Sequence, residues 1–202
     1  MVIVERTLSA HRSPVETAAA ALRGGATAIQ LRNKDDSARE LLLAAKELLP
    51  LREATGALLI VNDRLDVALA SGADGVHLGQ FDLPVAAARR VAPPGFAIGY
   101  STDDPSAARR SVADGASYIG CGTVFPTSTK PDAGRAIGPE GVLAVSAGCD
   151  APVVAIGGIT PANVAKLAGT CTGVAAVGAL MAAEDPEAVA VSLRTGFDGG
   201  VR

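Results

Sequence analysis

Short apolar segments alternate with alanine-rich segments along the whole chain. The apolar segments are near-continuous hydrophobic runs, which is typical of parallel strands that are covered on both faces. We expect strands at residues 2–4, 26–31, 57–61, 75–78, 96–99, 117–121, 152–156 and 173–177. We expect helices at residues 14–22, 37–51, 64–71, 83–91, 105–113, 139–146, 161–167 and 186–194. This alternation in 202 residues predicts an α/β fold, a single (β/α)8 TIM barrel domain over residues 1–202 with a frayed tail at 196–202.

The composition narrows the class of protein. The formal net charge is −3 and the basic residues form no block, so we expect no nucleic-acid surface. The three cysteines are widely spaced, which fits reduced thiols better than a disulfide framework or a zinc site. The sequence shows no signal peptide, and its longest uncharged run, 167–183, is short for a membrane span. We therefore expect a cytoplasmic protein that acts on small molecules, without a membrane partner. Its oligomeric state stays open, and a homo-oligomer is compatible with the sequence.

A loop rich in hydroxyl groups directly follows the expected strand 117–121. This loop, residues 122–130, contains Thr127 and Thr129 and ends in Lys130. Hydroxyl and ammonium groups both donate hydrogen bonds to oxygen. Because active sites of TIM barrels lie at the carboxyl ends of the strands, the loop is a candidate site for an anion.

Basic side chains follow the second expected strand. Gln30, Arg32 and Lys34 are spaced two residues apart, and the period of a strand places all three on one face, directed to the barrel mouth. Taken alone, such a trio is about as compatible with a solvated strand end as with a binding site.

Two acids follow the third and fourth expected strands. Each of Asp63 and Asp82 is, by itself, compatible with a helix cap. Together they follow neighbouring strands and can reach the same side of the mouth, beside Arg32, Lys34 and Lys130. Mg²⁺ binds through one or two carboxylates plus substrate oxygens, so this group predicts a magnesium site with a bridging diphosphate.

Glycines and hydroxyl groups mark the remaining strand ends. Ser101 ends the fifth strand, Gly157 and Gly158 end the seventh, and Gly178 ends the eighth. Glycine exposes backbone N–H groups to a close anion, and TIM barrels often bind phosphate with the loops after strands seven and eight. The mouth is thus expected to hold two anion sites, one for a diphosphate and one for a monophosphate. For His77, at the end of an apolar run, we expect a core or supporting role.

At this point the motifs resemble a known family. The segments that carry the resemblance are Gln30–Lys34, Asn62–Arg64, Gly75–Gln80 with Asp82–Pro84, Gly122–Lys130 with Asp132 and Ala133, and Ile156–Thr160. In this order and at this spacing they look like thiamine-phosphate synthase, from about residue 4 to residue 183. The resemblance implies a transferase that joins a hydroxymethylpyrimidine diphosphate to a hydroxyethylthiazole phosphate, giving thiamine phosphate and pyrophosphate. It also implies Mg²⁺ as cofactor.

The resemblance implies a role for each matching residue. Metal ligands would be Asp63 and Asp82. The diphosphate would be held by Arg32, Lys34, Asn62 and Lys130, with Ser101 near the reacting centre and Gln30 on the pyrimidine side. The thiazole phosphate would be held by Thr127, Thr129 and the backbone around Gly157, Gly158, Gly178 and Ala179. The implied reaction is dissociative, and Ser101, Lys130, Arg32 and Lys34 would assist catalysis.

The chain departs from the family pattern at Tyr100, Asp103, Phe81 and Gly178. Two alternative functions stay open. One is the related thiazole tautomerase, which resembles this chain but has a His where Asp103 stands and lacks the metal acids. The other is a non-catalytic phosphate-binding or regulatory barrel, because a fold alone does not determine function.

Overall fold

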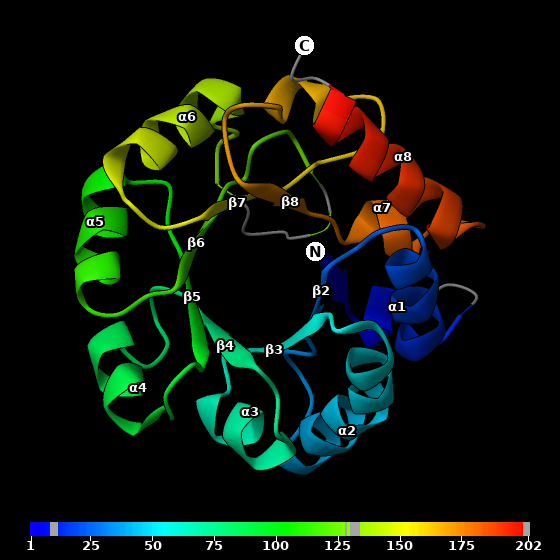
Figure 1. Ribbon diagram of the computed structural model, residues 1–202, viewed down its shortest axis with the longest axis vertical. Coiled ribbons are helices and arrows are strands. Elements are labelled where there is room, and N and C mark those ends of the chain that lie inside the picture. The colour runs from blue at the N-terminus through cyan, green and yellow to red at the C-terminus, as the bar shows by residue number, and fades with distance from the viewer. Residues whose placement is uncertain (9–11, 128, 130–133, 200–202) are drawn as a thin grey trace.

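Eight parallel strands form a barrel that a ring of helices surrounds (Figure 1). The computed structural model describes residues 1–8, 12–127, 129 and 134–199. Neighbouring strands pair in the order of the sequence. A parallel bridge between Val2 and Ala176, supported by a 3.0 Å hydrogen bond from the Ile3 amide to the Ala176 carbonyl, brings the last strand back to the first. The prediction of a TIM barrel is confirmed.

All eight expected strands are present, with ends shifted by up to two residues. They are β1 (Val2–Val4), β2 (Ala28–Leu31), β3 (Leu58–Asn62), β4 (Gly75–Leu78), β5 (Ala97–Ser101), β6 (Tyr118–Cys121), β7 (Val153–Ile156) and β8 (Gly173–Ala175).

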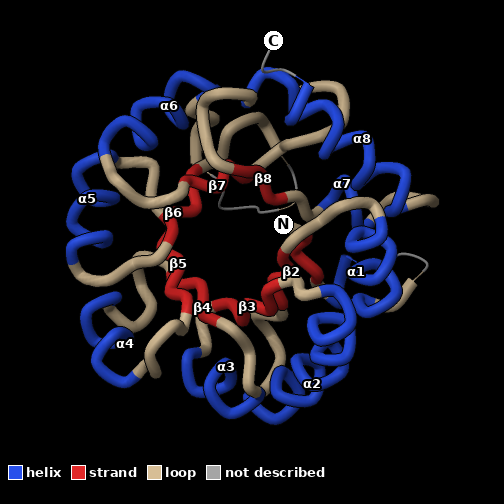
Figure 2. Tube along the Cα trace, in the orientation of Figure 1, coloured by secondary structure: helices blue, strands red, loops and turns tan. Residues whose placement is uncertain are grey.

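The helices lie outside the strands (Figure 2). They are η1 (Arg6–Leu8), α1 (Pro14–Arg23), α2 (Ala38–Thr55), α3 (Leu65–Ser71), α4 (Val85–Val91), α5 (Pro105–Ala113), α6 (Gly138–Gly148), η2 (Val164–Leu167), α7 (Gly178–Met181) and α8 (Pro186–Gly199). The short helices η1 and α7 were not expected from the sequence. No helix in the described residues is long and apolar enough to cross a membrane.

Two helical segments differ from the expectation. The segment 161–167 contains only the 3-10 helix η2, because the side chain of Asn163 bonds the preceding loop: it accepts from the Thr160 amide at 2.9 Å and donates to the Gly158 carbonyl at 2.8 Å. Helix α8 continues to Gly199, into the segment that we expected to fray. An ion pair between Arg194 and Asp198 and the packing of Phe197 against the core support its last turn.

Serine caps start the two helices next to the basic side of the mouth. Ser13 and Ser37 accept hydrogen bonds from the backbone amides of Glu16 and Glu40, and each glutamate carboxylate accepts one from the serine amide in return. This reciprocal arrangement satisfies two helix-end donors at once. The sequence therefore determines where α1 and α2 begin.

Alternate residues along each strand face two different environments, the barrel interior and the layer between the strands and the helices. Val2 and Val4 belong to the hydrophobic cluster between the strands and the helices, whereas Ile3 lies between them with its side chain on the opposite face, inside the barrel. Ile3, Gln30 and Ile60 stand opposite one another in the strand register. The interior of the barrel at this level therefore holds the buried amide of Gln30 between two isoleucine side chains.

Candidate active site

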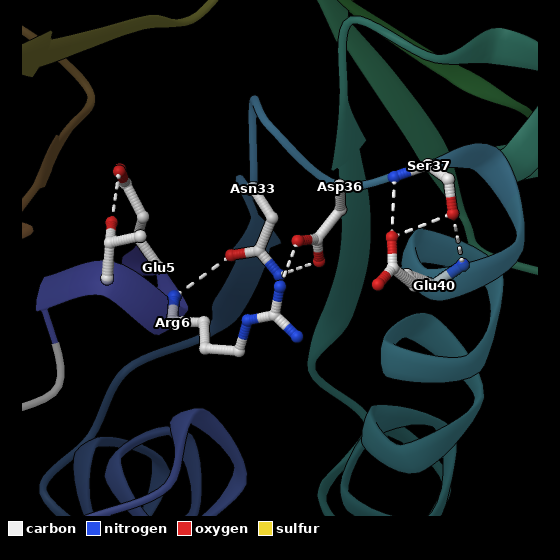
Figure 3. A network of polar contacts seen from close by, with 7 residues as sticks. Glu5, Arg6, Asn33, Asp36, Ser37 and Glu40 are labelled. Atoms are coloured by element: carbon white, nitrogen blue, oxygen red, sulfur yellow. Dashed lines mark hydrogen bonds and ion pairs between the residues drawn. The ribbon is translucent and has the colours of Figure 1, made fainter.

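An ion-pair network ties the basic loop after β2 to the end of β1. Arg32 pairs with Glu5, and both side chains are mostly buried. In the same loop, Asn33 accepts a hydrogen bond from the Arg6 amide at 2.9 Å, and Arg6 pairs with Asp36 (Figure 3). The loop that carries Arg32 is thus held in place before any ligand binds. Sequence reasoning missed Glu5, which has no motif of its own and can be found only through its pairing.

The two acids lie together at the ends of β3 and β4. Asp63 has a left-handed backbone, with φ of 62°, and its amide donates to the His77 carbonyl at 2.8 Å. The Asp82 carboxylate accepts from the Gly79 amide at 2.6 Å. These backbone contacts turn both carboxyl groups toward the same part of the mouth.

The electrostatics of Asp63 show which groups face it. The pKa of Asp63 is raised to about 6, first by burial and then by the hydrogen bond and negative charge of Asp82, while Lys34 and Arg32 act in the opposite direction. Asp63, Asp82, Arg32 and Lys34 therefore share one electrostatic environment. Asn62, the last residue of β3, stands opposite His77 in the register beside them.

A second group of donors lies at the ends of β6, β7 and β8. The loop after β6 runs along β7, because the Val124 and Phe125 amides donate to the Ile156 and Gly157 carbonyls at 3.0 Å each. A side chain at Gly158 would have its Cβ only 2.5 Å from the Phe125 carbonyl oxygen, so glycine is needed for this approach.

The same loop brings threonine hydroxyl groups toward the start of α7. The Thr129 amide donates to the Thr127 hydroxyl at 3.2 Å. A Cβ at Gly178 would lie 2.9 Å from the Thr129 hydroxyl oxygen, so this hydroxyl occupies the space that a side chain at position 178 would use. The structure thus brings Thr127, Thr129, Gly157, Gly158 and Gly178 together, and Ala179 follows in the first turn of α7. We call this group the glycine–threonine cradle.

A buried polar network lies below the mouth. His77 is 8% exposed, and its Nε2 and Nδ1 atoms lie 2.7 Å from the Ser101 hydroxyl and 2.9 Å from the Tyr118 hydroxyl. Burial lowers the pKa of His77 to about 4, although Asp82 acts in the opposite direction. Burial also raises the pKa of Tyr118, and Gln30 acts in the opposite direction.

The predicted site residues are therefore distributed as follows. Arg32, Lys34, Asp63 and Asp82 gather on one side of the mouth, and the glycine–threonine cradle forms at the ends of β6 to β8. Ser101 lies at the end of β5 and contacts the His77 network. Lys130 lies outside the described residues. Tyr118 was not identified from the sequence, because it lies inside an apolar run and only strand parity shows that it faces inward.

The fold and the site define a class: a TIM barrel whose strand ends carry charged groups and hydrogen-bond donors around one mouth. Comparisons with known proteins identify the family. The sequence model of the family described as thiamine monophosphate synthase matches residues 1–180. The chain belongs to this family, and it is a transferase enzyme of thiamine biosynthesis.

Individual relatives agree with this assignment. The chain is 46% identical to the thiamine-phosphate synthase of Roseiflexus castenholzii over 193 residues, which are 95% of this chain and 85% of that protein. It is 47% identical to the thiamine-phosphate synthase of Methanoculleus marisnigri over 194 residues, 96% of this chain and 92% of that protein. Among solved structures, the thiamine phosphate pyrophosphorylase of Pyrococcus furiosus superposes with a TM-score of 0.89 at 40% identity, covering 100% of this chain and 96% of that chain.

Proposed function

We propose that this enzyme joins 4-amino-2-methyl-5-hydroxymethylpyrimidine diphosphate to 4-methyl-5-(2-hydroxyethyl)thiazole phosphate, giving thiamine phosphate and pyrophosphate. The observation that carries the proposal is the pairing of Asp63 and Asp82 beside Arg32 and Lys34 at the mouth that also holds the glycine–threonine cradle. One side suits a metal-bound diphosphate, and the other suits a monophosphate. Family membership supports the same assignment.

The two acids fit a magnesium ion. Burial raises the pKa of Asp63 and the neighbouring negative charge of Asp82 adds to this, and a divalent cation between the two carboxylates would relieve the repulsion. In the described residues, no group of three or more His, Cys, Asp or Glu side chains could hold a metal by itself. A pair of carboxylates completed by substrate oxygens is the arrangement that Mg²⁺ commonly uses with phosphates. When bound, Mg²⁺ would neutralise charge on the departing diphosphate.

The reaction needs no protein nucleophile. The C–O bond to the diphosphate breaks, its electron pair stays on the diphosphate oxygen, and the pyrimidine cation that remains is stabilised by its ring amine. The thiazole nitrogen then attacks that carbon. Arg32, Lys34 and Lys130 would hold the diphosphate and stabilise its growing charge, and Ser101 would lie near the reacting carbon. Such preorganised donors supply a large share of many enzymes' rate enhancement.

Substitution of the acids tests the proposal. We expect Asp63→Asn and Asp82→Asn each to lower turnover by at least about 100-fold, comparable to removal of one preorganised charge-stabilising group. Lys130→Ala should have an effect of the same order. Turnover is followed as thiamine phosphate by mass spectrometry, and Mn²⁺ binding to the free enzyme is measured in parallel.

Asp66→Asn is the matched control, because Asp66 lies three residues after Asp63 but is exposed and pairs with Arg64 at 2.6 Å. It should keep near-normal turnover and metal affinity. Near-full turnover of Asp63→Asn at saturating substrates and Mg²⁺ would contradict the metal assignment.

The proposed reaction and the cysteines also indicate the binding partners and the cellular location. The proposed partners are the two phosphorylated substrates, without nucleic acid or membrane. Cys121, Cys149 and Cys171 are free thiols, which fits the cytoplasm that we propose as the location.

A further inference from the structure

The network below the mouth connects three strands through the barrel interior. His77 on β4 contacts the Tyr118 hydroxyl on β6 and the Ser101 hydroxyl on β5. Gln30 on β2 lowers the pKa of the same phenol, and its amide nitrogen lies 3.7 Å from Sδ of Met1. Of these four side chains, only Ser101 is exposed. The network therefore runs from the barrel interior to the hydroxyl group of Ser101 at the open mouth.

Two glycines make room for this network. A Cβ at Gly99 would lie 2.2 Å from Cζ of Tyr118 and 2.4 Å from Nδ1 of His77. A Cβ at Gly120 would lie 2.8 Å from Cε1 of His77 and 3.5 Å from the Ser101 hydroxyl oxygen. Side chains at these two positions would block the contacts on both sides of the imidazole. The chain thus leaves open the space that this one arrangement of His77 needs.

The contacts also favour one direction for each hydrogen bond. His77 is buried and its ring nitrogens contact hydroxyl groups rather than carboxylates, so it is held neutral, with one donor and one acceptor nitrogen. In the described residues, the hydrogen-bond partner that the structure gives the Tyr118 hydroxyl is Nδ1 of His77 at 2.9 Å, so this half-buried hydroxyl satisfies its hydrogen by donating to Nδ1. The ring proton then lies on Nε2 and is donated to Ser101.

We propose that Tyr118 and His77 are positioning residues that hold the Ser101 oxygen as an acceptor and so leave its O–H free to donate into the mouth. This inference rests on the proposed function. The acceptor that fits such a donor is an oxygen of the departing diphosphate, which gains negative charge as the C–O bond breaks. A hydroxyl group held in this orientation needs no reorganisation during the reaction.

Single variants of Tyr118 and His77 are the first part of a double-mutant series that tests whether both residues act through Ser101. Tyr118→Phe removes only the hydroxyl group that donates to Nδ1 of His77, and we expect kcat to fall about 10-fold. His77→Leu removes both hydrogen bonds of the imidazole, to Tyr118 and to Ser101. We expect kcat to fall about 100-fold, which is the size of effect that misplacement of a catalytic group can have. His77→Gln places an amide N–H near the Nε2 position and should restore most of the lost kcat. The KM for the thiazole phosphate should change little in all three variants.

The decisive comparison repeats these variants with Ser101→Ala. If the two residues act through Ser101, each adds less than about a 2-fold loss in that background, because the effects of coupled residues do not add. An equal loss in both backgrounds would overturn the proposal and indicate general loosening of the barrel. Tyr100→Phe is the control, since it removes the hydroxyl of the other tyrosine, which packs against the outer core. Melting temperatures identify any variant that fails to fold.

A second measurement does not depend on activity. The chain has two histidines, His11 and His77, so ¹⁵N spectra of histidine-labelled protein are readily assigned with a His11→Gln variant. The proposal predicts the Nε2–H tautomer at His77 in the wild type and loss of that preference in Tyr118→Phe. The Nδ1–H tautomer in the wild type would overturn it. A wild-type enzyme that shows the predicted tautomer but forms no thiamine phosphate would contradict the proposed function and not the hydrogen-bond order.

Discussion

At the scale of single residues, burial shifts the pKa values of two groups around the mouth in opposite directions. The pKa of His77 falls to about 4 and that of Asp63 rises to about 6, and in each case the largest cause is loss of water. The two shifts have opposite effects on the pH dependence of stability. A neutral His77 favours the folded state above its unfolded pKa, whereas a raised Asp63 pKa favours folding at lower pH.

His77 gives a prediction for the free energy of unfolding. Its folded pKa lies below the ordinary 6.5, so the unfolded state binds more protons between pH 6.5 and 4. The wild type should therefore lose about 3 kcal/mol of stability through His77 as the pH falls from 6.5 toward 4. Denaturant titrations of the wild type and His77→Gln measure this, because the difference between them cancels the contribution of Asp63. A difference that stays constant with pH would contradict the buried neutral state.

Single residues also show the limits of sequence reasoning at the site. The residues that follow strand ends, such as Arg32 and Asp63, could be predicted because TIM barrels place strand ends at the mouth. Glu5 and Tyr118 could not, since each is defined by a partner far away in the sequence, Arg32 and His77 respectively. Spacing within one segment carries no information about such partners.

At the scale of elements, the loop after β6 and the end of β7 behave as one unit. Backbone hydrogen bonds join them, and Gly157 and Gly158 both have left-handed backbones, with φ of 102° and 64°. The strands were predicted well because their apolar runs reflect burial on both faces. The segment 161–167 was predicted less well, because the side chain of Asn163 competes locally with helix formation.

The substitution Gly158→Ala tests whether the loop after β6 and the end of β7 act together in substrate binding. The new Cβ would lie 2.5 Å from the Phe125 carbonyl oxygen and 2.6 Å from the Pro126 carbonyl oxygen, so the β6 loop must move away. We expect the KM for the thiazole phosphate to rise about 10-fold or more, because displacement of a binding group by about 1 Å has effects of this size. Steady-state kinetics with varied thiazole phosphate measure the change.

Gly169→Ala is the matched control for backbone strain. Gly169 has a similar φ of 76°, but a Cβ there would meet nothing within 4 Å. Both variants should lose some stability, and only Gly158→Ala should raise the KM. An equal rise in both variants would show that strain, and not the contact with the β6 loop, affects substrate binding.

At the scale of the whole molecule, the barrel brings eight strand ends to one mouth and so places the two proposed anion sites against each other. The acids and cations come from β2 to β4, and the glycine–threonine cradle comes from β6 to β8. His77, Tyr118 and Ser101 lie in the polar layer of β4 to β6 between these two groups. This division explains how one small domain could hold two phosphorylated substrates with their reacting atoms close together.

The most direct test of this account is a single-turnover reaction of the wild-type enzyme with both phosphorylated substrates, with Mg²⁺ and with a chelator, analysed by mass spectrometry. We predict thiamine phosphate and pyrophosphate in equal amounts with Mg²⁺, and almost no product with the chelator. Binding of the thiazole phosphate without any coupled product in the presence of Mg²⁺ would contradict the account.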